Sequence, residues 1–349
     1  MADLPAFKSR VHELPDSPEA VLAFITERRW GDGLPVIPPT AERVAAMIEP
    51  SGRAPDEVVG VLGPVDADVT VEKVAINAVM AGCLPAYLPV VLAAIEGVID
   101  PAFNARSVQA TTNPVAVMAV VNGPIRHALD INCRRGCLGP GWRANATIGR
   151  AIRLVLINVG GGLPGEVDKA VHGMPGKYTF CFGEDEEGSP WEPLHVERGF
   201  DRATSTVTVC AIQDMVNSLT TGVVKSETLL KIAAPVLATP ANNNTMSGGG
   251  EPVLLITRGH AEMLARDGFT KASCRQYLYE HATVPVEALG DAEYPGKPFQ
   301  PVDGLLRPLR RPEDLMILVA GGDEHYHHQV MHTFGEDTKS ITRPIQPIQ

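Results

Sequence analysis

The chain has 349 residues, of which 44% are hydrophobic and 20% charged, and its formal net charge is -11. This apolar fraction is enough for a folded core, so the composition excludes a mainly disordered chain. Acidic residues outnumber basic ones by 41 to 30. That balance argues against non-specific nucleic-acid binding and against docking on an anionic membrane, because both need a basic surface.

Two further features bear on where the chain works. No stretch approaches the roughly 18 consecutive apolar residues that span a bilayer, and the first residues lack the basic and apolar regions of a signal peptide. The six cysteines are irregularly spaced, which is not the pattern of a disulfide-stapled domain. We therefore expect a cytoplasmic protein with reduced thiols.

Predicted helices and a proline-rich loop open the chain. Ser17 can cap a first helix, and Pro18 suits its first turn. The segment 30–39 then holds several prolines and glycines, which cannot continue a helix. The predicted elements are a helix at 17–30, a helix at 40–48 and a strand at 58–62, with residues 1–57 forming an N-terminal arm.

The rest of the chain carries an internal duplication. Both copies place a helix with a proline, a polar loop, an apolar strand and a second helix in the same order. The strands are continuous apolar runs, which is typical of strands buried on both faces. The first copy has these elements at 89–93, 109–113, 115–121 and 145–158, and the second has them at 235–238, 241–245, 253–256 and 270–281.

We therefore predict an α/β protein built from internally duplicated α/β halves with pseudo-twofold symmetry and a site between the halves. The first repeat spans residues 58–200 and includes a cysteine-containing insert. The second spans residues 201–349 and ends in a histidine-rich segment. Ligands of such folds sit outside the carboxyl ends of the strands or between the halves.

Polar loops at equivalent places in the two copies are candidates for binding a substrate. Asn and Thr also cap turns routinely, so the loops could instead be structural. The second copy adds a glycine-rich nest whose amides could approach an anion. Its glycines precede the strand, so the nest is not a nucleotide fingerprint. The candidate residues are Thr111, Thr112 and Asn113 in the first copy, and Asn242, Asn243, Gly249 and Gly250 in the second.

The first copy is longer because of an insert that contains Cys133 and Cys137 with two arginines between them. Insertions into loops often carry added function. Arginines next to a thiol favour the thiolate, so the insert could be a redox dithiol or half of a metal site. The alternative is a surface loop with incidental thiols.

Other reactive side chains lie near the predicted strands. A cysteine thiol or an imidazole could be the reactive group, and a carboxylate or a second imidazole could transfer protons. A basic side chain would bind the substrate anion, and Cys83 could alternatively be buried and inert. The candidates are Cys83, Cys181, His195, Glu251 and His172 for catalysis, and Arg143, Lys177 and Tyr178 for substrate binding.

A histidine-rich segment near the end of the chain could hold a metal. His328 and His332 are four residues apart and would meet on one face of a helix, with His325 close by. Imidazoles in that arrangement bind zinc, copper or iron. The segment therefore leaves a metal-dependent enzyme open as an alternative.

Four motifs resemble a bacterial family associated with UGSC-motif (seleno)proteins. They are residues 30–35 (WGDGLP), 141–147 (GWRANAT), 175–180 (PGKYTF) and 189–195 (SPWEPLH). The resemblance runs over most of the chain and implies thiol redox chemistry, although the family has no settled activity. A Cys-Gly-Ser-Cys motif is absent from this sequence, so such a motif would have to come from a partner.

The sequence as a whole favours an enzyme that acts on a small polar or anionic molecule. The expected chemistry is thiol-linked reduction or cleavage of a carbon–heteroatom bond. A metal-dependent hydrolase or lyase using His, Cys or Glu ligands is the second hypothesis, and a non-catalytic subunit of a redox complex is the third. We expect a homo-oligomer with a thiol or selenol redox partner protein, and neither a nucleic-acid nor a membrane partner.

Overall fold

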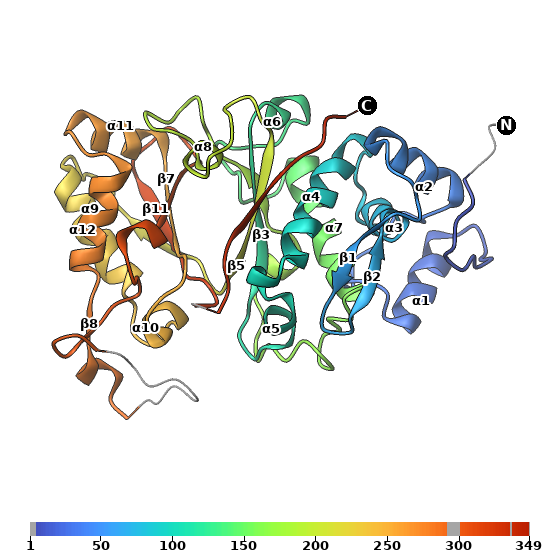
Figure 1. Cartoon of the computed structure of the whole chain (residues 1–349), viewed down its shortest axis with the longest axis horizontal. Helices are drawn as coiled ribbons and strands as arrows, with labels where there is room; N and C mark the ends of the chain where they lie inside the picture. Colours follow the sequence, from blue (N-terminus) through green and yellow to red (C-terminus); the bar gives the residue numbers. More distant parts are fainter. Residues whose placement is uncertain (1–4, 292–300, 336, 349) are drawn as a thin grey trace.

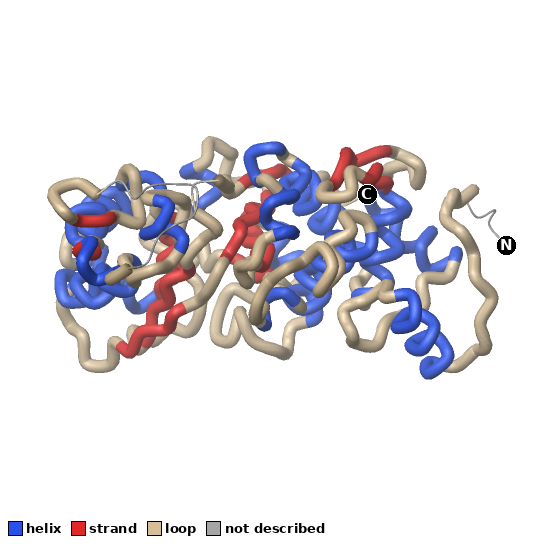
Figure 2. The backbone as a smooth tube through the Cα atoms, turned by 90° about the horizontal axis from the view of Figure 1, so that it is seen from below, coloured by secondary structure: helices blue, strands red, loops and turns tan. Residues whose placement is uncertain are grey.

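The computed structural model describes residues 5–291, 301–335 and 337–348. It is a mixed α/β protein, which confirms the predicted class. The molecule is elongated: a helical N-terminal part, a first sheet and a second sheet follow one another along its long axis (Figure 1 and Figure 2). Buried apolar side chains pack under the helices of each sheet and also between the two sheets.

The N-terminal part contains the elements expected there. The hydroxyls of Ser17 and Thr40 cap the first two helices by accepting backbone N–H bonds. The proline-rich loop between the helices is tied to the core by Asp32, which accepts from Arg150 Nε at 2.7 Å. The elements are α1 (Pro18–Arg28), α2 (Ala41–Ile48), β1 (Val58–Leu62) and β2 (Ala67–Thr70), the last two paired antiparallel.

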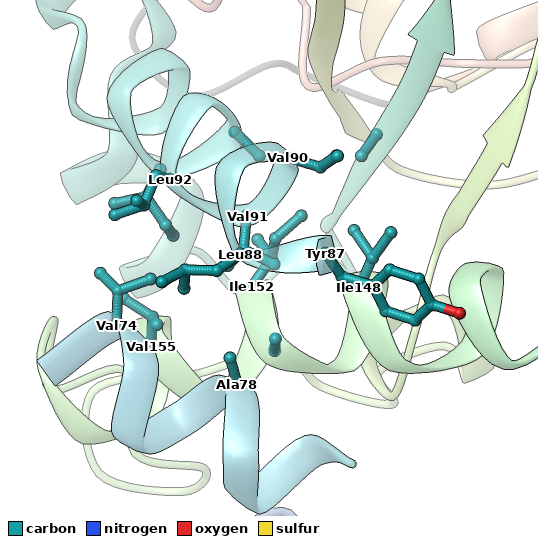
Figure 3. Close-up of a cluster of buried hydrophobic side chains, with 14 of the residues drawn as sticks. Val74, Ala78, Tyr87, Leu88, Val90, Val91, Leu92, Ile148, Ile152 and Val155 are labelled. Atoms are coloured by element: carbon teal, nitrogen blue, oxygen red, sulfur yellow. The ribbon is translucent and has the colours of Figure 1, made fainter. Parts of the chain in front are cut away.

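Three helices form an apolar layer behind the first sheet (Figure 3). The middle one, α4, is apolar on nearly all sides because it lies between the sheet and the other two helices. Leu88 and Val91 of α4 and Ile152 of α7 are fully buried in this layer. The helices are α3 (Val71–Ala81), α4 (Leu88–Ile99) and α7 (Arg143–Asn158).

The first sheet has the strand order β12–β5–β3–β4. β3 runs parallel to β4 and antiparallel to β5, and β5 runs antiparallel to β12. Every residue of β5 is buried, as expected for a central strand covered on both faces. The strands are β3 (Ala116–Asn122), β4 (Cys181–Gly183), β5 (Thr206–Ile212) and β12 (Ile341–Pro344).

The second sheet has the order β10–β7–β11–β6 and the same directions. β7 runs parallel to β10 and antiparallel to β11, which runs antiparallel to β6. Helices α9, α11 and α12 cover one face. The elements are β6 (Val216–Leu219), α9 (Ser226–Leu237), β7 (Val253–Ile256), α11 (Arg258–Arg266), α12 (Lys271–His281), β10 (Met316–Val319) and β11 (His327–Met331).

The two sheets exchange their fourth strands. After β5 of the first sheet the chain crosses to form β6 of the second, and after β11 of the second sheet it crosses back to form β12 of the first. The crossing segments meet at an antiparallel bridge between Ile212 and Thr333. The N–H of Gln213 donates to His332 O at 2.7 Å, and the N–H of Phe334 donates to Ala211 O at 3.0 Å.

One sequence-based prediction about secondary structure is wrong. The segment with His328 and His332 was expected to be helical, but residues 327–331 form strand β11, which pairs with both β6 and β7. Pairing with two neighbouring strands determines the conformation of this segment, and the helical spacing of the histidines does not. The helix face on which the two imidazoles were expected to meet does not form.

Short elements complete the fold. α5 and α10 precede β3 and β7 at their amino ends, while α6 and α8 lie at the opposite edge (Figure 1). Among the described residues no single helix is long and apolar enough to cross a membrane, although one pair bent by 71°, Pro85–Ile99 with Pro101–Ala110, passes on length and composition. The elements are α5 (Ala105–Ala110), α6 (Ile125–Ala128), α8 (Leu194–Glu197), α10 (Asn243–Ser247), β8 (Val284–Pro285) and β9 (Leu305–Leu306).

Candidate functional site

Both parallel strand pairs end at the same edge of the molecule. The carboxyl ends of β3 and β4 in the first sheet, and of β7 and β10 in the second, lie at the edge that carries α6, α8 and α11, which is uppermost in Figure 1. In open α/β sheets ligands bind outside the carboxyl ends of the strands. This edge is therefore where the fold leads us to expect a ligand.

A pocket of about 420 Å³ opens at the carboxyl ends of β7 and β10. Its roof is the segment 135–139 of the insert, and side chains of the second sheet, Leu255, Ala320 and Gln329, form its floor. We call this cavity the insert pocket. Its lining also includes Thr257, Gly321, Gly322, Glu324, Tyr326, His327 and His328.

The roof of the insert pocket is fixed on both sides. On one side the Asn145 side chain of α7 accepts from the N–H of Asn132 (2.8 Å) and donates to the carbonyl oxygens of Asn132 (2.9 Å) and Cys137 (3.1 Å). On the other side the N–H of Gly321 donates to Cys133 O at 3.0 Å. Arg135 adds an ion pair with Glu324, another residue of the pocket lining. The insert thus bridges the two sheets.

Two thiols belong to the insert. Cys137 lines the insert pocket, and Cys133 precedes it by one turn. Burial, together with the nearby Cys133, raises the pKa of Cys137 to about 12. Burial also raises the pKa of Cys133, although Arg126 and Arg134 oppose that shift. Both groups are therefore thiols at neutral pH, and not thiolates.

Adjacent residues of β11 serve different faces of the second sheet. Side chains alternate along a strand, so Gln329 shares the pocket face with Met331, whereas the His328 ring shares the helix-covered face with Val330. Within the described ranges, Gln329 Oε1 and both ring nitrogens of His328 are buried without a hydrogen-bond partner. Burial lowers the pKa of His328 to about 4, so its ring is neutral at pH 7.

A second buried histidine connects to the lining of the pocket. His260 Nε2 lies 3.0 Å from Thr220 Oγ1, and its Nδ1 lies 3.0 Å from Thr257 Oγ1. The Thr220 hydroxyl donates to His325 O, so it accepts from Nε2, and Nδ1 accepts the Thr257 proton. Burial and the neighbouring His328 lower the pKa of His260 to about 3, which keeps this ring neutral as well.

Beyond the parallel pair of the first sheet lies a buried polar group that we call the carboxylate cluster: Asn122, Arg126, Glu184, Glu186 and His195. Asn122 Nδ2 donates to Glu184 at 2.7 Å and to Glu186 at 3.1 Å, and Arg126 Nε lies 3.0 Å from Glu186. His195 Nδ1 lies 4.0 Å from the same Glu186 oxygen. Burial raises the pKa of Glu184, opposed by its hydrogen bonds and by a lysine.

That lysine comes from the other sheet's helix layer. Lys271 of α12 is buried, and its Nζ donates to Glu192 O at 2.7 Å and to Glu197 at 3.0 Å, with Glu184 at 3.8 Å. Arg275, one turn further along α12, also pairs with Glu197 at 3.0 Å. These contacts join the carboxylate cluster to the helices of the second sheet.

The two cysteines predicted to react lie outside the insert pocket. Cys83 follows α3 in the apolar core, where its thiol donates to Thr147 O at 3.3 Å. Cys181 of β4 is packed in the same core. Burial raises the pKa of each thiol to about 12, so neither is a thiolate at neutral pH.

The other predicted catalytic residues are dispersed. His172 is exposed in the loop after α7. Glu251 accepts from the backbone N–H and the hydroxyl of Ser340, and so it anchors the segment before β12. His195 does lie at the carboxyl edge, but in the carboxylate cluster. The structure therefore places none of the five predicted catalytic residues in the insert pocket.

The loop predicted to bind substrate in the first copy lies at the amino end of β3, opposite to the insert pocket. Thr111 Oγ1 accepts from the backbone N–H of Asn113 at 3.1 Å, which closes a local turn. Thr112 and Tyr178 are exposed. The loop has the hydrogen bonding of a turn.

The matching loop of the second copy is also occupied by its own bonds. Asn242 caps α10 through its side chain, and Asn243 is buried in the first turn. Asn244, a further residue of the same predicted loop, donates to Gly249 O at 3.0 Å. A Cβ on Gly250 would lie only 2.3 Å from the same amide nitrogen. Gly250 therefore allows the Asn244 side chain to pack closely against the backbone, in the space where an anion was expected to bind.

The predicted anion-binding residues have partners of their own. Arg143 Nε donates to Gly82 O at 3.0 Å, at the end of α3. Lys177 Nζ lies 2.7 Å from Asp168, which also pairs with Arg153 at 2.8 Å. The lysine is thus part of a structural ion-pair group near the amino end of β3.

The three histidines proposed as metal ligands do not converge. His332 Nδ1 lies 2.6 Å from Asp214, and its Nε2 faces Val236 O at 3.0 Å, so both nitrogens are occupied. His328 and His325 flank His260 with ring centroids 6.3 Å away. Across the part of the chain that is described, no group of three or more His, Cys, Asp or Glu could hold a metal ion. The metal-dependent hypothesis thus gains no site.

Several pocket residues were not selected from the sequence. Arg135, Thr257, Glu324 and Gln329 line the cavity together, but Arg135 and Glu324 are 189 residues apart in the chain. Local patterns cannot signal such a pair. The usable signal was the insert itself, because it interrupts the predicted repeat, and its segment 135–139 forms the roof.

No protein-family model matches the chain, and neither a curated protein nor a solved structure matches it. The resemblance to the UGSC-associated family therefore stays a prediction.

Proposed function

We propose that the chain is an enzyme that binds a small polar or anionic molecule in the insert pocket. It acts on that molecule by thiol-linked reduction or by cleavage of a carbon–heteroatom bond. Cys137 takes the reactive role that the sequence suggested for Cys83 or Cys181. The observation that carries this proposal is that Cys137 is one of the residues lining a cavity of about 420 Å³ at the carboxyl edge.

The chemistry uses both thiols of the insert. After losing its proton, Cys137 attacks the electrophilic atom of the substrate and displaces the leaving group, which takes up a proton. Cys133 then attacks the Cys137 sulfur, forms a disulfide with it and releases the substrate fragment, which takes the bonding electron pair and a second proton. The substrate gains two electrons and two protons, and the dithiol loses them.

A partner must return the disulfide to the dithiol. A thiol or selenol protein does this by exchange, with its own pair becoming the disulfide. Such a partner agrees with the resemblance to the UGSC-associated family. It also agrees with a reducing cytoplasm, where free thiols persist.

The finer part of the predicted fold belongs to the same proposal. We propose that the two sheets are a duplicated unit related by a pseudo-twofold axis near the bridge between Ile212 and Thr333. Support comes from the shared strand order, the shared directions and the reciprocal exchange of the fourth strand. The insert pocket then lies between the halves, with its roof from the first half and its floor from the second.

A model disulfide tests the dithiol. We expect the reduced protein, incubated with bis(2-hydroxyethyl) disulfide, to lose the mass of two hydrogens and to yield a peptide with a Cys133–Cys137 disulfide. Cys137→Ser should abolish that disulfide, because the attacking thiol is gone. Cys83→Ser is the matched control and should oxidise as the wild type does, since Cys83 lies in the core outside the pocket.

Two results would overturn the proposal. One is a wild-type protein whose Cys133 and Cys137 stay reduced while the reagent oxidises a reference dithiol. The other is an equal mass loss in the wild type and in Cys137→Ser, which would place the reactive thiols elsewhere.

A further inference from the structure

We propose that the insert pocket binds a carboxylic acid through Arg135, and that Glu324 occupies Arg135 until the substrate carboxylate takes its place. The inference rests on the proposed function, because it names the substrate class of the same pocket. It assigns the anion-binding role to a residue of the roof. The sequence had suggested Arg143 or Lys177 for that role, and both have structural partners.

The Arg135–Glu324 pair lies at the mouth of the pocket. Both residues line the cavity, yet 72% of the Arg135 side chain and 37% of the Glu324 side chain are exposed. The hydrogen bond from Arg135 lowers the pKa of Glu324, so the carboxylate is charged at neutral pH. Arg135 comes from the roof and Glu324 from the segment after β10, so the pair closes the cavity from two sides.

A glycine makes room for this pair. A Cβ on Gly322 would lie 2.6 Å from Glu324 Oε2 and 3.7 Å from Arg135 Nη2. A side chain at this position would require the Glu324 carboxylate to shift. Gly322, three residues after the end of β10, therefore leaves room for a carboxylate, whether that of Glu324 or that of a ligand, beside Arg135.

Exchange of one carboxylate for another is energetically easy at this site. Exposed ion pairs contribute little, because water and salt compete for both charges. A ligand carboxylate that is held by further contacts in the pocket keeps the bidentate geometry that a guanidinium favours, while Glu324 returns to solvent. The amino end of α11, capped by the pocket residue Thr257, adds a favourable dipole for an anion.

The remaining lining narrows the ligand further. Leu138, Leu255 and Ala320 give the cavity an apolar surface. Gln329 Oε1 is a buried acceptor to which no described residue donates. A group with an N–H or O–H would satisfy it, since unpaired buried acceptors are costly. The pocket thus fits a carboxylic acid with an apolar body and a hydrogen-bond donor, such as an acylated amino acid.

Alkylation of Cys137 by matched reagents tests the role of Arg135. Iodoacetate carries a carboxylate and iodoacetamide does not. The measured quantity is the rate of alkylation of Cys137 by iodoacetate divided by the rate by iodoacetamide, normalised to the same ratio for N-acetylcysteine. A high value of this ratio reports attraction of the carboxylate by a nearby cation. We expect this ratio to rise about two- to fivefold in Glu324→Gln, where Arg135 is released, and to fall below the wild-type value in Arg135→Gln. Mass spectrometry of the peptide with Cys137 gives both rates, and that with Cys83 is the internal control.

The outcomes separate the inference from the proposed function. If neither reagent labels Cys137 faster than the core thiol Cys83, the pocket does not present a reactive thiol and the proposed function fails. If Cys137 is labelled but the ratio is the same in all three proteins, the proposed function stands and the carboxylate inference fails.

A ligand pair gives an independent measurement. N-acetylphenylalanine has a carboxylate, an N–H and an apolar body, and N-acetylphenylalaninamide lacks only the charge. We expect the acid to protect Cys137 from iodoacetamide more strongly than the amide in the wild type, and this preference to disappear in Arg135→Gln. Equal protection by acid and amide in the wild type would overturn the inference.

Discussion

The two parallel strand pairs have the same backbone arrangement, but different side chains follow their carboxyl ends. Beyond β4 the chain continues with Glu184, Asp185 and Glu186, whose buried side chains fill the space together with Arg126, which lies in α6 after β3. Beyond β10 it continues with Gly321 and Gly322, and the insert pocket stays open. One edge of the molecule therefore carries a filled site and an open one.

The difference teaches how one strand arrangement serves stability at one place and binding at another. Buried charges hold a structure only when every partner is present, because an unpaired charge in the core is costly. Exposed charges such as Arg135 and Glu324 can change partners with little loss. The carboxylate cluster should accordingly resist change, and the mouth of the insert pocket should tolerate it.

The largest effect is expected from breaking the carboxylate cluster. Arg126→Met removes the buried guanidinium that lies 3.0 Å from Glu186 and 2.9 Å from Glu187. Those carboxylates then lose their cation, and we expect the free energy of unfolding to fall by about 3–5 kcal/mol. Urea unfolding at pH 7 measures this loss, and urea does not screen the charges.

The matched control is an arginine in an exposed pair. Arg106→Met removes the partner of Asp66, where both side chains are more than half exposed, and it should cost less than about 1 kcal/mol. An equal loss of unfolding free energy in the two variants would show that the buried carboxylate cluster stabilises the fold no more than a surface ion pair does. The proposed difference between the filled and the open site would then be wrong.

A smaller effect is expected from His328, on the helix side of the open site's sheet. Its folded pKa of about 4 lies below the ordinary 6.5, so the unfolded chain binds the proton better and stability falls as pH drops from 6.5 towards 4. His328→Phe removes this titration. We therefore compare the free energy of unfolding of the variant with that of the wild type. As the pH is lowered from 8 to 5, the variant should gain about 2 kcal/mol relative to the wild type.

An exposed histidine provides the control for that pH profile. His172→Gln replaces an imidazole at the surface, so its pH profile is the reference against which that of His328→Phe is compared. His260, with its pKa lowered to about 3, remains in both variants and keeps part of the acid sensitivity. A parallel pH profile for His328→Phe and the wild type would mean that the His328 ring is not buried as a neutral group.

Much of the fold could be predicted because local rules govern it. Ser17 and Thr40 cap helices as expected, and the apolar run at 253–256 forms β7 with the predicted bounds. The strand exchange could not be predicted, because pairing of β6 with β11 and of β12 with β5 joins distant segments. The helix predicted for the histidine segment was wrong for the same reason, because the neighbouring strands of the sheet determine its conformation.

The candidate site was predictable in outline. The insert with Cys133 and Cys137 stood out because it interrupts the predicted repeat, and its segment 135–139 forms the roof of the pocket. Cys83 and Cys181 also suggested reactivity, but burial in the core depends on the packing of separate helices and strands. Which of several cysteines meets a cavity is a property of the tertiary structure.

The smallest effect on stability is expected at the mouth of the insert pocket, which is the open site of the comparison. Glu324→Gln removes one partner of an exposed pair, so we expect no measurable change in the urea midpoint. The same variant should nevertheless raise the preference of Cys137 for iodoacetate. A large loss of stability would instead make Glu324 a structural partner of Arg135, and a ligand carboxylate could then not displace it.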